Sequence, residues 1–164
     1  MAAFVKYIEE GRGGWIGFHH STLLGEFDGY KMRPRFSQFM GDIRFTDYIA
    51  KFANATVIVE DPSHPAMRNF GRSFVVQDEE WYTCNKSARP NVHVLGRVNE
   101  DTYSPNTSIK MGADHPGDHP VVWTNEHFKA RNIYIFMEHH HPELFQNASF
   151  TTLVTNSIFW AAQP

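Results

Sequence analysis

The sequence is poor in cysteine, long apolar runs and clustered positive charge, on which several classes of protein depend. Cys84 is the only cysteine among 164 residues, so no disulfide can form within the chain. No apolar run approaches the roughly 20 residues that a membrane-spanning helix needs. The 15 Lys and Arg residues form no basic block and are outnumbered by 18 Asp and Glu residues, whereas nucleic-acid binding needs clustered positive charge. We therefore expect one domain over residues 1–164, with neither a nucleic-acid nor a membrane partner.

Several motifs that carry chemistry are also missing. The chain has no HExxH sequence and no CxxC pair, which are common marks of zinc sites. Ser21 is not set in GxSxG, and Cys84 has no strand-to-helix elbow around it. The glycines at 11–14 precede a predicted strand, whereas a phosphate loop follows a strand and opens a helix. Nucleophilic catalysis by serine or cysteine and phosphate binding at a Gly-rich loop are therefore not expected.

Histidines and aromatic residues, by contrast, are abundant. The chain has 10 His, and 15% of its residues are Phe, Trp or Tyr, which suggests aromatic packing or an aromatic-lined cleft. His19 and His20 follow the short apolar run 15–18, which is too short for a helix and is preceded by glycine. We interpret this run as a buried strand, and ligands gather beyond the carboxyl ends of such strands. One of the two histidines could instead be purely structural.

The order of the predicted elements indicates an α/β fold. Helices are predicted over 2–10, 33–40 and 149–162, and strands over 14–19, 55–60, 73–76, 91–98, 120–125 and 132–137. The segment 45–52 is ambiguous, and 99–118 is predicted to be a polar loop. Because a helix opens the chain and leads straight into a strand, the chain begins in the middle of a βαβ unit. We therefore expect a mainly parallel sheet flanked by helices, with its first βα units missing.

Polar side chains stand at the ends of several predicted strands. They are His19 and His20, His64, the acidic segment 78–80 and the histidines at 139–141. If the sheet is mainly parallel, these ends could converge on one rim. Imidazole and carboxylate groups could there ligate a divalent metal such as Zn²⁺, or act as general acid and base. Both remain open from the sequence, and His115 and His119 are interpreted as parts of a solvated loop.

Motifs spread over nearly the whole chain, in a fixed order, resemble those of one family. They are GGWIGFHHS at 13–21, DPSHP at 61–65, EEWY at 79–82, PVVWT at 120–124, ARNIY at 130–134, EH at 138–139 and FWAA at 159–162. In this series the sequence resembles the trehalose-utilisation (ThuA-like) family. It departs from the family pattern at Glu79, Ala130 and Glu138, where the family has Asp, Gly and Gly.

The resemblance implies a flavodoxin-like fold similar to the class I glutamine amidotransferases, with a mainly parallel sheet and its first βα units absent. His19 then stands where those enzymes carry their catalytic cysteine, so glutamine hydrolysis by a thiol is not available. The resemblance implies sugar metabolism instead, around trehalose or related keto-glycosides. A sheet edge left open by the missing strands would be covered by another subunit, so we also expect a homo-oligomer.

From the strand ends and the resemblance we expect a site for a small-molecule sugar. The expected catalytic residues are His19, Glu80 and His139, and the expected substrate-binding residues are His20, His64, Trp81 and Tyr82. His19 or Glu80 would be the general base, and His139 would stabilise or protonate an oxygen of the sugar.

Three other hypotheses stay open at this point. The chain could be a non-catalytic sugar-binding or regulatory subunit beside an oxidoreductase, a metal-dependent hydrolase or isomerase, or an inactive fragment. We expect no signal peptide over segment 1–10, because it carries a lysine and two glutamates. We expect a cytoplasmic location, with a periplasmic one as the alternative if the natural N-terminus is missing.

Overall fold

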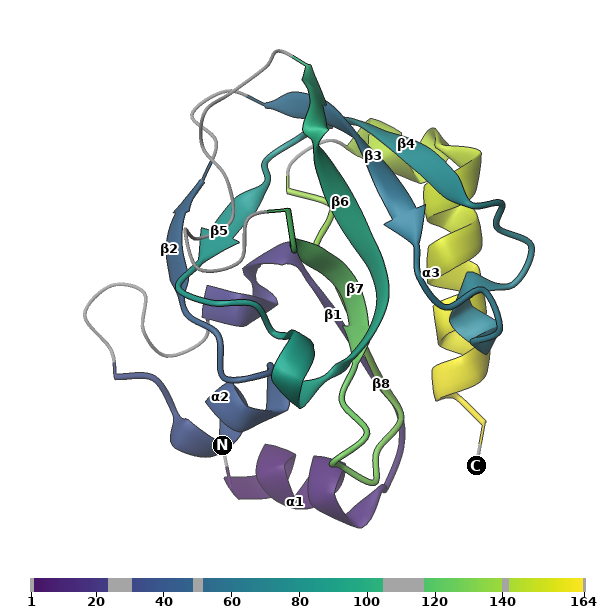
Figure 1. Cartoon of the computed structure of the whole chain (residues 1–164). Coiled ribbons are helices and arrows are strands. Elements are labelled where there is room, and N and C mark those ends of the chain that lie inside the picture. The colour runs from purple at the N-terminus through teal and green to yellow at the C-terminus, as the bar shows by residue number, and fades with distance from the viewer. Residues whose placement is uncertain (1, 24–30, 49–51, 105–116, 140–141, 164) are drawn as a thin grey trace.

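The computed structural model describes residues 2–23, 31–48, 52–104, 117–139 and 142–163 (Figure 1). The strands are β1 (Trp15–Phe18), β2 (Phe45–Tyr48), β3 (Ala53–Val59), β4 (Ser73–Glu79), β5 (Tyr82–Cys84), β6 (His93–Ser104), β7 (Pro120–Thr124) and β8 (Asn132–Ile135). The helices are α1 (Ala2–Glu10), α2 (Pro34–Phe39) and α3 (Ala148–Ala161), with 3₁₀ turns at His19–Leu23, Pro65–Met67, Arg89–Asn91 and Pro142–Gln146. His115, His140 and His141, which the sequence singled out, lie outside the described residues.

One curled, mixed sheet forms the centre of the fold. Its strand order is β1-β8-β7-β6-β3-β4, and β2 pairs with β5 in a separate ladder. Only the β1–β8 pair is parallel among the described ladders, and every other pair is antiparallel. The expectation of a mainly parallel sheet is therefore wrong. A helix that leads into β1 suggests a parallel sheet. Short connections such as the β7–β8 turn, however, let the later strands pair antiparallel.

The strand directions decide which ends meet. Because β8 is parallel to β1 and antiparallel to β7, and each later pair is antiparallel, β1, β8, β6 and β4 run one way. β7 and β3 run the opposite way. The carboxyl ends of β1, β8 and β4 therefore lie at the same edge of the sheet, and that of β3 lies at the opposite edge.

Helix α3 covers one face of the sheet (Figure 1) and contacts β1 and β8. Asn147 caps the helix, because its Oδ1 accepts hydrogen bonds from the backbone N–H groups of Ser149 and Phe150 at 3.0 and 3.1 Å. Phe150 and Leu153 are both fully buried and fall on one face of the helix. The predicted helix 149–162 is thus confirmed, as are those over 2–10 and 33–40 within a residue or two at each end.

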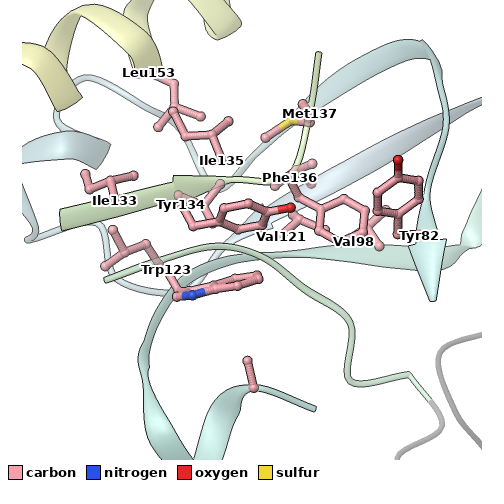
Figure 2. Close-up of a cluster of buried hydrophobic side chains, with 14 of the residues drawn as sticks. Tyr82, Val98, Val121, Trp123, Ile133, Tyr134, Ile135, Phe136, Met137 and Leu153 are labelled. Carbon is pink, nitrogen blue, oxygen red and sulfur yellow. The ribbon is translucent and has the colours of Figure 1, made fainter. Parts of the chain in front are cut away.

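The core is built on both faces of β8. Figure 2 shows Ile133 and Ile135 on the side of Leu153, whereas Tyr134 and Phe136 point the other way, toward Trp123 and Tyr82. Every side chain of β8 is buried, because β1 and β7 flank the strand and other elements cover both of its faces. This alternation places the side chains of Tyr134 and Phe136 against His19, which directly follows β1.

Two sequence predictions about the segment 99–119 are wrong. Residues 99–104 extend strand β6 and are not part of a loop. His119 is fully buried, with its Nδ1 3.0 Å from a Glu100 carboxylate oxygen and 3.2 Å from the Tyr103 hydroxyl. The polar residues of this segment are typical of a solvated loop, but Glu100 and Tyr103 lie on β6 and pair with His119, which precedes β7, inside the fold.

Candidate functional site

The polar residues that end β1, β4 and β8 meet at one edge of the sheet. β1 leads into His19, β4 ends at Glu79 and is followed by Glu80, and the chain after β8 reaches His139. The rings of His19 and His139 lie 4.9 Å apart between centroids, and that of His20 lies 5.1 Å from His139. Three segments far apart in the sequence thus build one cluster.

His19 is the deepest member of the cluster and is held by three hydrogen bonds. Its backbone turns sharply after β1, with φ at 26°, and its carbonyl accepts hydrogen bonds from the hydroxyls of Tyr134 at 2.6 Å and Thr22 at 3.3 Å. Its Nδ1 lies 2.9 Å from the carbonyl oxygen of Phe136, so Nδ1 carries the hydrogen and Nε2 a lone pair. Burial lowers the pKa of His19 to about 3, so the imidazole is neutral.

Glu79 joins the ends of β4 and β8. Its carboxylate oxygens accept hydrogen bonds from the backbone N–H groups of Glu138 at 2.7 Å, Glu80 at 3.0 Å and His139 at 3.2 Å. The side chain is 3% exposed, and burial raises its pKa to about 7 against the opposing effect of these hydrogen bonds. Glu79 Oε1 also lies 3.7 Å from His19 Nδ1, but the nearer Phe136 carbonyl takes that hydrogen.

A β-bulge turns Glu79 inward. The register of β3 against β4 shifts between Ala53 and Ala55, which pair with Glu79 and Val76, so β4 carries one extra residue. Phe74 and Val76 are buried in alternation, and without the bulge the next buried position would be Asp78. Asp78 is instead exposed, with φ at 53°, and Glu79 takes the inward place.

Glu80 faces both deeper histidines through one atom. Its Oε2 lies 3.4 Å from His19 Nε2 and 3.3 Å from His139 Nε2. The exposed fraction of the side chains rises from 1% at His19 through 12% at Glu80 to 23% at His139, and His20 is exposed. Partial burial raises the pKa of Glu80. The cluster is therefore closed at His19 and open to solvent at His20, which allows a small molecule to reach it from that side.

The comparisons with known proteins agree with this architecture. A model of the family described as trehalose utilisation (ThuA) matches residues 1–161. The chain belongs to the ThuA family. None of the curated proteins matches it.

Solved structures of two ThuA-like proteins and of a third protein share the fold. One from Bacteroides uniformis has a TM-score of 0.80 at 29% identity, covering 98% of this chain and 62% of that protein. Another, from Parabacteroides merdae, has a TM-score of 0.71 at 16% identity and covers 99% and 64%. A cytoplasmic protein from Salmonella typhimurium has a TM-score of 0.62 at 15% identity and covers 99% and 60%. The chain spans less than two thirds of the length of each.

Two aromatic residues of the ThuA motif at 79–82 lie inside the fold. Tyr82 is 3% exposed and its ring centroid lies 4.1 Å from that of His19, so it forms a wall of the cluster. Trp81 is fully buried, donates from Nε1 to the carbonyl of Ala53 at 2.9 Å and packs against Tyr103. Trp81 therefore offers no exposed ring to a sugar in this structure.

His64 lies away from the cluster. It follows β3, whose carboxyl end is at the opposite edge of the sheet. Its ring packs on Trp160 at 4.6 Å, its Nδ1 accepts a hydrogen bond from the N–H of Ala66 at 3.2 Å, and burial lowers its pKa. The expectation that all the polar strand ends converge is therefore wrong for His64, because it required a parallel sheet.

Sequence reasoning missed the parts that hold the cluster in place. The sequence patterns give Glu79 no role beyond its place in the acidic segment 78–80 and its departure from the ThuA motif, and they assign no role to Tyr134 or the Phe136 carbonyl. A bulge at 77–78 could not be read from the alternation of SFVVQDE. A signal was nevertheless present, since Asp78, Glu79 and Glu80 follow an apolar strand directly and one of them must end near its buried face.

Cys84 is predicted to be chemically inert in the folded protein. Its thiol is 2% exposed, and burial raises its pKa to about 12, so little of the reactive thiolate forms near neutral pH. We expect no reaction with a thiol reagent such as dithionitrobenzoate under native conditions and labelling of one thiol per chain in guanidinium. Rapid labelling of the native protein would contradict this and would restore a thiol nucleophile as a candidate.

None of the described helices combines the length and apolar composition needed to cross a lipid bilayer.

Proposed function

We propose that this ThuA-family chain acts in carbohydrate metabolism and performs acid–base chemistry on a disaccharide or keto-glycoside at the His19–Glu80–His139 cluster. The observation that carries the proposal is that one oxygen of Glu80 lies 3.3–3.4 Å from the Nε2 atoms of both histidines, at the carboxyl ends of strands. Ligands gather at such strand ends in α/β folds. The trehalose-utilisation family supports a sugar as the ligand.

Each member of the cluster has a distinct role in this proposal. Glu80 or the neutral His19 accepts the proton of a sugar hydroxyl or of a carbon next to a keto group. His139 donates a hydrogen bond or a proton to an oxygen of the same sugar, which stabilises the negative charge that develops there. His20, at the open side, contacts the sugar and orients it, and the buried Tyr82 supports the ring of His19. Glu79 acts through the backbone of 138–139 and is a positioning residue.

The test is turnover of a panel of disaccharides and their keto derivatives, followed by chromatography and NMR. We expect Glu80→Gln and His139→Ala to lower kcat/KM by about 100-fold or more, because general acid–base groups typically contribute factors of that size. The matched control is His127→Ala, because His127 is an exposed histidine on the β7–β8 turn at the opposite edge of the sheet. Circular dichroism would verify that each variant is folded.

Two outcomes would contradict the proposed chemistry. Turnover that is unchanged in both variants would place the reaction elsewhere. Sugar binding measured by calorimetry, without turnover of any member of the panel, would instead support a sugar-binding or regulatory subunit.

Three other expectations stay proposals. A likeness to the class I glutamine amidotransferases is supported by the sharp turn at His19, where β1 leads directly into the 3₁₀ turn His19–Leu23. A homo-oligomer is compatible with β1 and β4 as the two outer strands of the described sheet, and light scattering would test it. The cytoplasmic location remains a prediction that fractionation of cells would test.

A further inference from the structure

We propose that His19, His139 and Glu80, with His20 at the open side, form a binding site for one divalent transition-metal ion, of which Zn²⁺ fits best. The inference deepens the proposed function, since it concerns the same cluster, but it depends on the geometry of the four side chains and not on the identity of the sugar. Imidazole and carboxylate are the usual zinc ligands after thiolate.

The first argument is the spacing of the ligand atoms. Four ligands at about 2.0–2.1 Å around a tetrahedral Zn²⁺ lie about 3.3–3.4 Å from one another. Glu80 Oε2 lies 3.4 Å from His19 Nε2 and 3.3 Å from His139 Nε2. One ligand nitrogen from each of His19, His20 and His139 falls within 4.8 Å of the others. Glu80 is not a member of that group of three, so His19, His139 and Glu80 supply three positions, and the fourth faces the exposed His20 and is open to water or substrate.

The second argument is the orientation of His19. Its Nδ1–H donates to the Phe136 carbonyl at 2.9 Å, so the lone pair of Nε2 is directed at the carboxylate of Glu80. In metal-binding histidines, the ring nitrogen that does not bind the metal usually donates a hydrogen bond to a carbonyl or carboxylate. That hydrogen bond fixes the tautomer and the orientation of the ring. The 3.4 Å between Nε2 and Oε2 is long for a hydrogen bond and suits two ligands that share a cation.

The third argument is the rigid base and open side of the cluster. His19 is 1% exposed and is surrounded by Tyr82 and Phe136, with ring centroids 4.1 and 5.9 Å away. The carboxylate of Glu79 accepts a hydrogen bond from the backbone N–H of His139, which fixes the backbone from which that side chain extends. The exposed His20 leaves a side of the metal accessible. Rigid inner ligands with an accessible outer position are typical of catalytic zinc sites, where water or substrate takes a place beside the protein ligands.

The metal would leave an acid–base group in place. Glu80 would bind through Oε2, which faces both rings, and its other oxygen would remain free to accept a proton from the sugar or from a water molecule. A bound Zn²⁺ would polarise a carbonyl or hydroxyl oxygen of the substrate. The site would therefore bind sugars that can place a carbonyl or hydroxyl oxygen on the side of His20.

The experiment is metal titration of protein whose purification tag has been removed and which has been treated with a chelator. Zn²⁺ is added in calorimetry and Co²⁺ in visible absorption spectroscopy, since tetrahedral Co²⁺ gives intense bands that report its ligands. We expect one ion per chain, a tetrahedral Co²⁺ spectrum and a rise in Tm with Zn²⁺. His19→Ala, Glu80→Gln and His139→Ala should each weaken Zn²⁺ binding by about 100-fold or more, and the exposed His20→Ala by less.

His127→Ala is the matched control, because it removes a histidine that is exposed and distant from the cluster. If His19→Ala fails to fold, Glu80→Gln and His20→Ala, which change less buried positions, still decide the result. The proposal is overturned if no stoichiometric ion binds, or if the cluster variants bind Zn²⁺ as tightly as His127→Ala does.

The result separates this inference from the proposed function. Stoichiometric Zn²⁺ binding without turnover of any sugar supports the metal site and contradicts the acid–base proposal. Turnover that survives complete metal removal contradicts the metal site as part of the chemistry and leaves the acid–base proposal intact.

Discussion

Replacement of Glu79 by alanine is expected to lower the free energy of unfolding by about 2–4 kcal/mol, because buried N–H groups that lose their acceptor cost about 1–3 kcal/mol each. The carboxylate accepts hydrogen bonds from three backbone N–H groups, those of Glu80, Glu138 and His139. The chain is only half-buried at 138–139, so water can replace some of the lost hydrogen bonds there. The expected decrease in the free energy of unfolding is therefore smaller than the sum for three fully buried N–H groups.

Two controls make the Glu79 prediction specific. Glu79→Gln keeps an oxygen for the N–H groups but turns an NH₂ toward one of them, so we expect an intermediate loss. Glu126→Ala removes a carboxylate that is 69% exposed and should change stability by less than about 1 kcal/mol. Urea denaturation followed by circular dichroism measures all three. An alanine variant as stable as the wild type would show that Glu79 does not hold the two segments together.

The same substitution should disturb the cluster more than the rest of the fold. Glu138 adopts a φ of 81°, which is unusual for a residue with a side chain, and the hydrogen bond from its N–H to Glu79 helps to hold it. Without that acceptor the segment 138–139 is free to relax, and His139 moves with it. Shifted NMR signals of the imidazole rings in Glu79→Ala, in a protein that remains folded, would report this displacement directly.

Truncation of Trp81 to alanine has the second large expected effect, a loss of about 3–5 kcal/mol in the free energy of unfolding. The indole is fully buried, and its removal leaves a cavity beside Tyr103. It also leaves the Ala53 carbonyl without its donor at 2.9 Å. The loss should exceed that for Trp81→Phe, which refills most of the volume but not the hydrogen bond. Thermal and urea denaturation would measure both variants.

Phe159→Ala is the matched control for Trp81, since Phe159 is an aromatic residue that is 70% exposed. Substitutions at such surface positions usually change stability by less than about 0.5 kcal/mol. Trp81→Phe also tests the expectation that Trp81 binds the sugar substrate. A Trp81→Phe protein of unchanged stability that no longer binds sugar would favour that role over the structural one.

The sequence by itself determined the local elements and the polar ends of the strands. The apolar run after the glycines at 13–14 predicted β1 and the histidines that end it. Periodicity predicted α1 and α3, and Pro34 near the first turn indicated α2. These signals are local, because a helix or strand repeats its apolar positions within a few residues. The motif series also predicted the ThuA family, which the family model confirms over residues 1–161.

Only the tertiary structure decided which polar ends meet. The apolar pattern of β3 is the same whether it pairs parallel or antiparallel, and its direction places His64 at the far edge of the sheet. The inward turn of Glu79 needs one extra residue in β4, which appears only in its pairing with β3. Burial of His19 likewise depends on Phe136, 117 residues away in the chain. Strand direction and long-range partners arise when the whole sheet assembles, so no short window of sequence contains them.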